Sequence, residues 1–242
     1  MQDSKYNVIE NAKEIITGYD GPKLRIMEVC GTHTHEIFRL GIRSLLSENI
    51  DLISGPGCPV CVTPVGYIDE AIYLALEKGC TICTFGDLIK VPGTEMSLAG
   101  ARTKGADIRP VYSPDDAVSL AKELTNVVFL AVGFETTTPS ACIAVKKAKK
   151  LGLKNFSILT ANKTMPNAYE KLKGSADAFL YPGHVNAITG NDVCKKLKEE
   201  GVSGVVAGFT AKELMTAIAV TIELSKKGEP FFENCYPREV RE

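Results

Sequence analysis

Residues 127–150, VVFLAVGFETTTPSACIAVKKAKK, decide the fold class of this chain. The apolar run at 127–132 is typical of a strand that is buried on both faces. Thr138 and Pro139 then mark a helix start, because a capping hydroxyl followed by a proline suits the first helical turn. A buried strand, a loop and a helix in this order form the repeating unit of an α/β protein.

The same alternation continues outward in both directions. We predict further buried strands at residues 24–29, 51–54, 80–85, 156–160, 178–181 and 204–209. Helical signals separate them: the spacing of Ile68, Ile72 and Leu76, the cap Ser113 before Pro114, and a capping box of Thr210 and Glu213. This alternation predicts an α/β fold of two similar Rossmann-like layers, with parallel sheets flanked by helices.

A weak similarity between the two halves of the chain suggests how the layers are divided. In each half of the chain, a polar loop follows one strand and a Pro-Gly loop follows another. We expect one α/β domain at residues 1–108, carrying CGTHTH and GPGCPVC, and a second at 109–228, carrying GFETTTP and PGHVNAITG. Residues 229–242 would form a C-terminal tail. The alternative, that the halves resemble each other only as any two α/β units do, stays open.

Composition argues against several classes of function. The 242 residues carry 28 basic and 29 acidic side chains, and no basic block suits a nucleic acid. No apolar run is long enough to cross a bilayer, and the N-terminus MQDSKYNVIE lacks the apolar core of a signal peptide. We therefore expect a cytoplasmic protein that binds neither nucleic acid nor membrane. Because the cytoplasm is reducing, the eight cysteines favour metal, redox or core roles over a disulfide framework.

Four unusual loops follow predicted strands. They are CGTHTH at residues 30–35, GPGCPVC at 55–61, GFETTTP at 133–139 and PGHVNAITG at 182–190. Parallel α/β folds place their sites at the carboxyl ends of the strands. We therefore expect the four loops to converge on one crevice.

Cys58 and Cys61 form a C-x-x-C pair in a loop fixed by proline and glycine. Such a pair can reach disulfide distance, and a helix starting near Thr63 would stabilise a thiolate, so we interpret it as a redox pair. One alternative is that Cys58 and Cys61 are simply buried loop cysteines. Another is a structural zinc site shared with Cys80 and Cys83, which follow after 18 residues. Against zinc, the second pair lies in a predicted core strand, where residues three apart face opposite sides.

Cys30, His33 and His35 gather three candidate ligands within six residues after a predicted strand. A thiol and imidazoles suit a soft or borderline metal such as iron or zinc. Alternatively, His33 acts as a base that activates Cys30. The structural alternative is a histidine that only caps the helix that follows.

Two further loops carry polar candidates. Glu135 follows a buried strand, where a carboxylate needs a partner. Thr136 and Thr137 precede a helix, so hydroxyls and backbone amides there could hold a small anion, unless the threonines serve only the capping by Thr138. His184, in the second Pro-Gly loop, is a candidate ligand, an acid/base group or a hydrogen-bonded structural residue.

Five motifs in order, MEVCGTHTHEI, SGPGCPVCVTP, TFGDLIKVPG, VGFETTTP and YPGHVNAITG, resemble those of the HypD family of hydrogenase maturation proteins. The resemblance runs from about residue 27 to residue 190, and more loosely to CYPREVR. It implies two α/β domains and a C-terminal iron–sulfur domain. It also implies an assembly factor for [NiFe]-hydrogenase that, with the partner HypC, carries the Fe(CN)₂CO unit while HypE delivers cyanide.

The resemblance implies roles for residues of this chain. Cys30 would be the iron-binding or catalytic cysteine with His33 beside it, and Cys58 and Cys61 the redox pair. Glu135 with its threonines, and His184, would line the same cleft. The family's [4Fe-4S] cysteines have no counterpart before Glu242, so we expect a fragment or a short relative. The alternative function is a stand-alone thiol–disulfide oxidoreductase, which would not need the CGTHTH loop.

Overall fold

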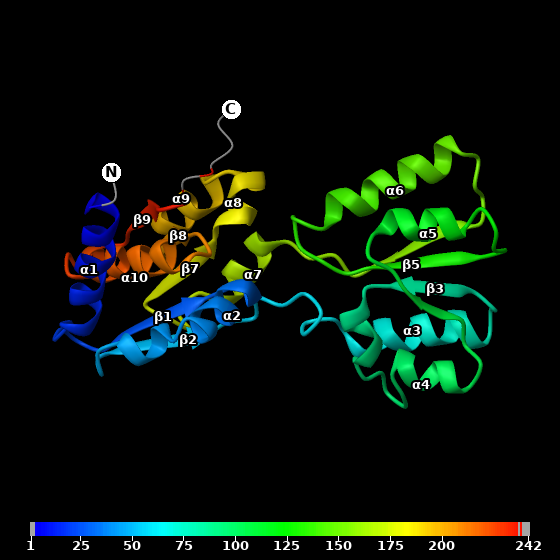
Figure 1. The fold of residues 1–242 in the computed structure, drawn as a ribbon, viewed down its shortest axis with the longest axis horizontal. Helices are drawn as coiled ribbons and strands as arrows, with labels where there is room; N and C mark the ends of the chain where they lie inside the picture. The colour runs from blue at the N-terminus through cyan, green and yellow to red at the C-terminus, as the bar shows by residue number, and fades with distance from the viewer. Residues whose placement is uncertain (1–2, 237, 239–242) are drawn as a thin grey trace. The chain divides into compact units, whose positions relative to one another are not determined.

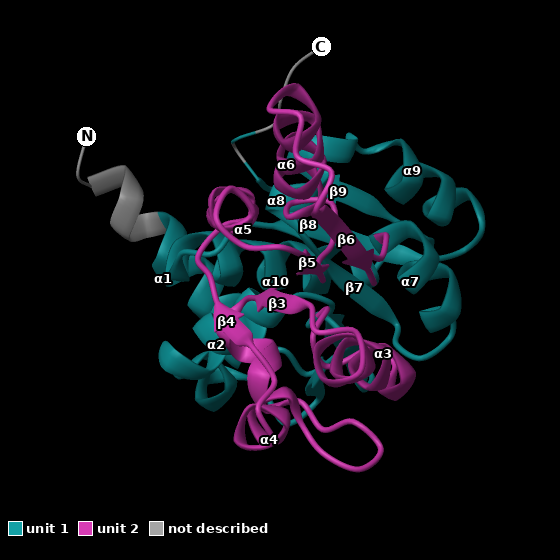
Figure 2. Cartoon of the chain, turned by 90° about the vertical axis from the view of Figure 1, so that its right-hand side faces the viewer, with its two compact units in different colours: residues 1–58, 165–242 teal, residues 59–164 magenta. Residues whose placement is uncertain are grey.

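The computed structural model describes residues 3–236 and 238, and the chain divides into two compact units (Figures 1 and 2). Unit 1 combines the chain up to Cys58 with the chain from Met165 onward, whereas unit 2 is the continuous segment from Pro59 to Thr164. Unit 2 is therefore inserted into unit 1 after its second strand. The expected boundary at residue 108 instead falls inside unit 2, because local periodicity reveals strands but not which strands pair.

Unit 1 is a parallel sheet in the order β2-β1-β7-β8-β9. Its strands are β1 (Leu24–Glu28), β2 (Ile50–Ser54), β7 (Ala178–Pro182), β8 (Ser203–Ala207) and β9 (Phe232–Asn234). The last of these lies in the segment expected to be a tail. That expectation is corrected, because β9 pairs with β8 at the edge of the sheet.

Helices cover both faces of the unit 1 sheet. On one face, Ile26, Leu180 and Val205 share a core with α1 (Asp3–Thr17), α2 (Gly31–Arg39), the 3₁₀ turn η1 (Ile42–Leu45) and α10 (Ala211–Ser225). The opposite face is covered by α7 (Met165–Leu172), α8 (Gly183–Thr189) and α9 (Asp192–Glu199). There the Tyr181 ring packs 4.9 Å from the ring of Tyr169. Strands buried on both faces explain why their sequences are continuously apolar.

Unit 2 is a parallel sheet in the order β4-β3-β5-β6. Its strands are β3 (Thr81–Thr84), β4 (Ile108–Pro110), β5 (Val127–Ala131) and β6 (Phe156–Thr160). Alternate residues of β5 face two cores. One contains α3 (Val65–Leu76), η2 (Gly86–Lys90) and α4 (Leu98–Thr103), and the other contains α5 (Pro114–Leu120) and α6 (Thr138–Lys150).

The two sheets share a topology. Numbered within each unit, both begin with the strand order 2-1-3-4. In such sheets the strand order reverses between the first and third strands, since the chain adds later strands on opposite sides of these two. Ligands bind at this switch point, at the carboxyl ends of the two strands. This switch point lies between β1 and β7 in unit 1 and between β3 and β5 in unit 2. The predicted α/β fold with two similar parallel layers is confirmed.

Most strands and helix caps predicted from the sequence are present in the structure. All seven predicted strands are present, whereas the short edge strands β4 and β9 were not predicted. Ser113 caps α5 in a reciprocal box with Asp116, and Thr210 does the same for α10 with Glu213. Among the described residues, no helix is long and apolar enough to cross a membrane.

Candidate functional site

Three of the four singled-out loops meet at the carboxyl edge of the unit 1 sheet. CGTHTH follows β1, the Gly-Pro-Gly-Cys turn follows β2, and PGHVNAITG follows β7, and these strands are neighbours. GFETTTP follows β5 in unit 2. The expected convergence therefore holds within unit 1 for three loops, while the fourth belongs to the other unit.

Cys30 lies where β1 gives way to α2. It is the N-cap residue of α2, with extended backbone angles (φ −148°, ψ 123°), and only 6% of it is exposed. Burial raises the pKa of its thiol, while hydrogen bonds from the backbone N–H groups of Thr32 and His33 act in the opposite direction. The sulfur is thus held at a helix N-terminus, which favours a thiolate once a cation offsets the burial.

The Gly-Pro-Gly-Cys turn packs directly on Cys30. A Cβ on Gly57 would lie 2.4 Å from both the Cα and the N atom of Cys30, so only glycine fits there. The N–H of Gly31 donates to the Gly57 carbonyl oxygen at 3.1 Å. A Cβ on Gly31 would lie 4.0 Å from the Cβ of Cys58, which therefore sits beside the start of α2.

Cys61 follows three residues later and belongs to unit 2, since the division of the chain falls between Cys58 and Pro59. There the hydroxyl of Thr63 donates to the Pro59 carbonyl oxygen at 2.9 Å and holds the turn. The helix expected to start near Thr63 begins at Val65. The two cysteines of the predicted redox pair are thus assigned to different units.

His33, in the first turn of α2, is fully buried. Its Nε2 lies 3.0 Å from the carbonyl oxygen of Gly208 and 3.3 Å from that of Ala207. Because a carbonyl oxygen only accepts, Nε2 carries the proton and Nδ1 presents a lone pair. Nδ1 has no hydrogen-bond partner among the described residues. Burial lowers the pKa of His33 to about 4, so the ring is neutral at physiological pH.

Phe209 links His33 to His184. Its ring centroid lies 4.8 Å from that of His33 and 4.9 Å from that of His184, so the two imidazoles contact the same aromatic ring. Burial lowers the pKa of His184 as well. His35 differs, because 72% of its side chain is exposed and it lies 3.9 Å from Glu36. Phe209 was not predicted as a site residue, although it ends a predicted strand.

Glu28 is a second residue that was not predicted. It ends β1, is completely buried, and accepts a hydrogen bond from the hydroxyl of Thr34 at 2.8 Å. Nη2 of Arg43 lies 3.9 Å from its Oε1 and donates to the hydroxyl of Ser54 at 3.0 Å. Burial raises the pKa of Glu28, and its charge raises the pKa of the Cys30 thiol. The feature of the sequence that could have identified Glu28 is a single carboxylate in an otherwise apolar strand.

The GFETTTP loop connects β5 to α6 in unit 2. Glu135 is half-buried and Thr136 is exposed. Thr137 is the N-cap residue of α6, but its side chain makes no capping bond. The hydroxyl of Thr138 donates to the Phe134 carbonyl oxygen at 2.9 Å instead of capping the helix.

Cys80 and Cys83 were both expected to be buried, but only Cys83 is, and Cys80 is partly exposed. Cys83 is fully buried in the core beneath α5, while Cys80 is half-buried against the core on the opposite face of the sheet. Their opposed directions, predicted from strand geometry, are confirmed. In the part of the chain that the structure describes, no group of three or more His, Cys, Asp or Glu residues is placed to hold a metal.

Comparison with known proteins gives a consistent result. The HypD family model, described as "Hydrogenase formation hypA family", matches residues 6–242. Hydrogenase maturation factor HypD of Azotobacter vinelandii is 41% identical over 229 residues, which cover 89% of this chain and 60% of the relative. HypD of Escherichia coli is 42% identical, covering 90% of this chain and 60% of the relative.

A putative hydrogenase expression/formation protein of Methanocaldococcus jannaschii is 43% identical, covering 90% of this chain and 63% of its own length. The chain thus spans about three-fifths of the length of these curated relatives. Among solved structures, a substrate-binding protein of Clostridium difficile covers 88% of this chain and 89% of its own. Its identity of 14% and TM-score of 0.17 are too low to support an argument.

Proposed function

Because this chain belongs to the HypD family, we propose that it takes part in maturation of [NiFe]-hydrogenase as a scaffold for assembly of the Fe(CN)₂CO unit. Its partners in this proposal are a HypC-type chaperone and a HypE-type cyanide donor. The observation that carries the proposal is the burial of Cys30 and His33 together at the start of α2. Both side chains are buried at the carboxyl edge of one sheet, and the imidazole has an unpartnered Nδ1 within the described residues.

Iron would enter this site as cargo. The Cys30 thiolate and His33 Nδ1 are the proposed ligands, since soft sulfur and imidazole nitrogen suit iron that carries strong-field ligands. A metal-binding histidine usually donates its other N–H to a carbonyl or carboxylate, as His33 Nε2 does to Gly208. Binding of a cation would offset the burial that raises the pKa of Cys30 and would release its proton.

Cys58 and Cys61 are proposed to supply reducing equivalents. Formation of one disulfide from two thiols releases two electrons to the iron–ligand assembly and two protons to solvent or nearby bases. Cys58 lies beside the start of α2, next to Cys30, which supports transfer toward this site. We further propose His184 as a proton donor or acceptor, and Glu135, Thr136 and Thr137 as groups that position ligands.

The alternative, a stand-alone thiol–disulfide oxidoreductase, would need only the C-x-x-C pair. Reduction of a disulfide substrate that persists at the unmodified rate in Cys30→Ser, with no iron bound in any form of the protein, would favour it. The buried arrangement of Cys30 and His33 supports the scaffold instead.

The scaffold proposal is tested by anaerobic purification of the chain with a HypC-type partner. Iron content and infrared bands in the cyanide and carbonyl stretching region are measured. We expect Cys30→Ser to abolish both, because the change removes the sulfur ligand without opening a large cavity. Cys142→Ser, at an exposed position on α6, is the control and should retain both. If Cys30→Ser keeps iron and its cyanide bands at the unmodified level, Cys30 is not the anchor.

A further inference from the structure

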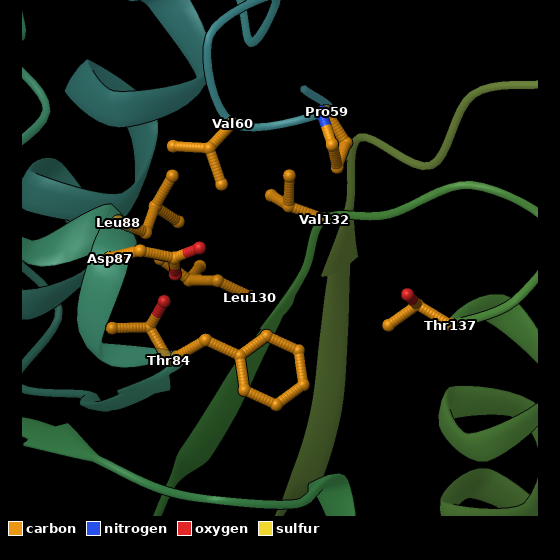
Figure 3. A pocket seen from close by; sticks show the side chains of 9 residues that line it. Pro59, Val60, Thr84, Asp87, Leu88, Leu130, Val132 and Thr137 are labelled. Carbon is orange, nitrogen blue, oxygen red and sulfur yellow. The ribbon is translucent and has the colours of Figure 1, made fainter. Parts of the chain in front are cut away.

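Unit 2 has a pocket of its own at its switch point. The cavity, of about 230 Å³, lies at the carboxyl ends of β3 and β5 and is formed entirely by residues of unit 2 (Figure 3). Its apolar lining includes Leu88, Leu130 and Val132, and its polar lining is Thr84, Asp87 and Thr137. This is where a parallel sheet of this strand order places a ligand.

Thr84 is the first sign that something binds there. Its side chain is completely buried, yet its hydroxyl has no hydrogen-bond partner among the residues that the structure describes. Leaving a buried hydroxyl without a partner destabilises a fold, so such a group calls for a ligand or a bound water. In Figure 3 the Thr84 hydroxyl points toward the side of the cavity that holds the Asp87 carboxylate.

The charge of the lining selects the ligand. Asp87 contributes a carboxylate, which only accepts hydrogen bonds, and among the residues that the structure describes no lysine, arginine or histidine lines the cavity. An anion would be repelled, whereas a group with N–H donors would bond Asp87 and the oxygen of Thr84 together. The apolar walls suit a small alkyl or carbonyl-bearing remainder, and the volume of about 230 Å³ exceeds the roughly 150 Å³ that holds a benzene ring.

We propose that this pocket binds a small ligand, or the end of a longer one, that presents N–H donors of a primary amide or primary ammonium group to Asp87 and Thr84. The pocket also adjoins the cysteine pair, because Pro59 and Val60, the two residues between Cys58 and Cys61, form part of its wall. A bound ligand would therefore contact the segment that joins the two thiols. Cys30 and His33 lie in unit 1, so this proposal does not depend on iron binding.

The test is a titration of the ¹⁵N-labelled full chain with acetamide, methylammonium chloride and sodium acetate, followed by NMR. We expect acetamide or methylammonium to give saturating shifts centred on the amides of Thr84 and Asp87, and acetate to give none. The two active probes distinguish a neutral ligand from a cationic one. Stronger binding of acetate, or no saturating shift at these residues with either donor, would overturn the proposal.

Two variants sharpen the test. Asp87→Asn should weaken binding of the active probe at least tenfold, whereas the control Asp115→Asn, at an exposed α5 position that pairs with Lys147, should leave it unchanged. Thr84→Val keeps the shape of the side chain. It should weaken binding and raise the melting temperature, because it removes the unpartnered hydroxyl. Binding to Asp87→Asn as tight as to the unmodified chain would contradict the assignment.

Discussion

The carboxyl edges of the two sheets have the same strand order but carry different chemistry. In unit 1, the edge buries ionisable groups: Glu28 and His33 are completely covered, and Cys30 is nearly so. In unit 2, the corresponding edge leaves a cavity lined by hydroxyls and by the exposed carboxylate of Asp87. Topology thus fixes where a site lies, while the side chains at the strand ends decide what it can bind.

The two edges also differ in their backbone packing at single glycines. In unit 1, the turn after β2 approaches Cys30 so closely that glycine is required at position 57. This close approach closes the edge and buries the thiol. In unit 2, a Cβ on Gly86, which follows β3, would meet none of the described atoms outside its chain neighbours within 4 Å.

The largest effect is expected for Gly57→Ala. The new Cβ would lie 2.4 Å from backbone atoms of Cys30, which cannot move aside as a side chain could. We expect the free energy of unfolding of unit 1 to fall by about 3 kcal/mol, the upper end of overpacking effects. Chemical denaturation measures the change.

Gly66→Ala in unit 2 is the matched control. Outside its chain neighbours and its own helix backbone, none of the described atoms lies within 4 Å of the added Cβ, and the position is helical. Stability should therefore stay equal or rise by roughly 0.5–1 kcal/mol. Equal losses in both variants would mean that the close approach in unit 1 does not distinguish the two edges.

The next effect is the acid sensitivity of unit 1. Burial lowers the pKa of His33 in the folded protein to about 4, whereas an unfolded histidine titrates near 6.5. Between these values the unfolded chain binds the extra proton. Stability of the metal-free protein therefore falls as the pH drops from 6.5 to 4, by roughly 2 to 3 kcal/mol from this residue.

Denaturation at pH 7.5 and pH 4.5 tests this for the unmodified chain and His33→Gln. The difference between them isolates His33 from Glu28 and His184, whose pKa values are also shifted by burial. His35→Gln, at an exposed position, is the control and should keep the pH dependence. An unchanged pH dependence in His33→Gln would show that His33 is not the acid-sensitive group.

A smaller loss of stability is expected when a helix cap is removed, and each unit offers one cap for comparison. Thr210 caps α10 of unit 1 and Ser113 caps α5 of unit 2 through equivalent reciprocal boxes. Thr210→Ala should therefore cost about 1 kcal/mol and speed hydrogen exchange in α10, and Ser113→Ala should do the same in α5. Thr210→Ser, which keeps the hydroxyl, should behave like the unmodified chain. Faster exchange in both helices from either variant would show that the units do not unfold separately.

The smallest effect concerns the thiol of Cys30. Glu28→Gln keeps an acceptor for Thr34 but removes the charge that raises the pKa of Cys30. We expect alkylation of Cys30 by iodoacetamide at pH 8 to become faster, because a lower pKa leaves more of the thiol as thiolate. Cys142 in the same sample is the internal control and should react at an unchanged rate. A slower reaction of Cys30 would mean that Glu28 acts through packing and not through its charge.

Much of the fold could be predicted from local sequence. Hydrophobic runs and caps gave the strands around residues 127–132 and the helices after Ser113 and Thr210, because these depend on neighbours along the chain. The insertion of unit 2 could not be predicted, since the pairing of β1 with β7 is a long-range property. Short edge strands such as β9 carry too few residues for a periodic signal.

The candidate site was predictable only in part. Cys30, His33 and His184 stood out by residue type, and the structure brings them to one sheet edge in unit 1. Phe209 and Glu28 did not stand out. An aromatic residue and a lone carboxylate gain a role only through what the fold places beside them, here two imidazoles and a buried thiol.

The insertion of unit 2 has a consequence for how the chain is made. During synthesis, β1 and β2 leave the ribosome first, but β1 must wait for β7, and the N–H of Arg25 bonds a carboxylate 152 positions later. Unit 2 is continuous and has all its strands once residue 164 has emerged, so we expect it to fold first. Through that whole interval the nascent chain carries β1 with an open edge and an uncovered apolar face, which makes it most dependent on chaperones while its middle is already folded.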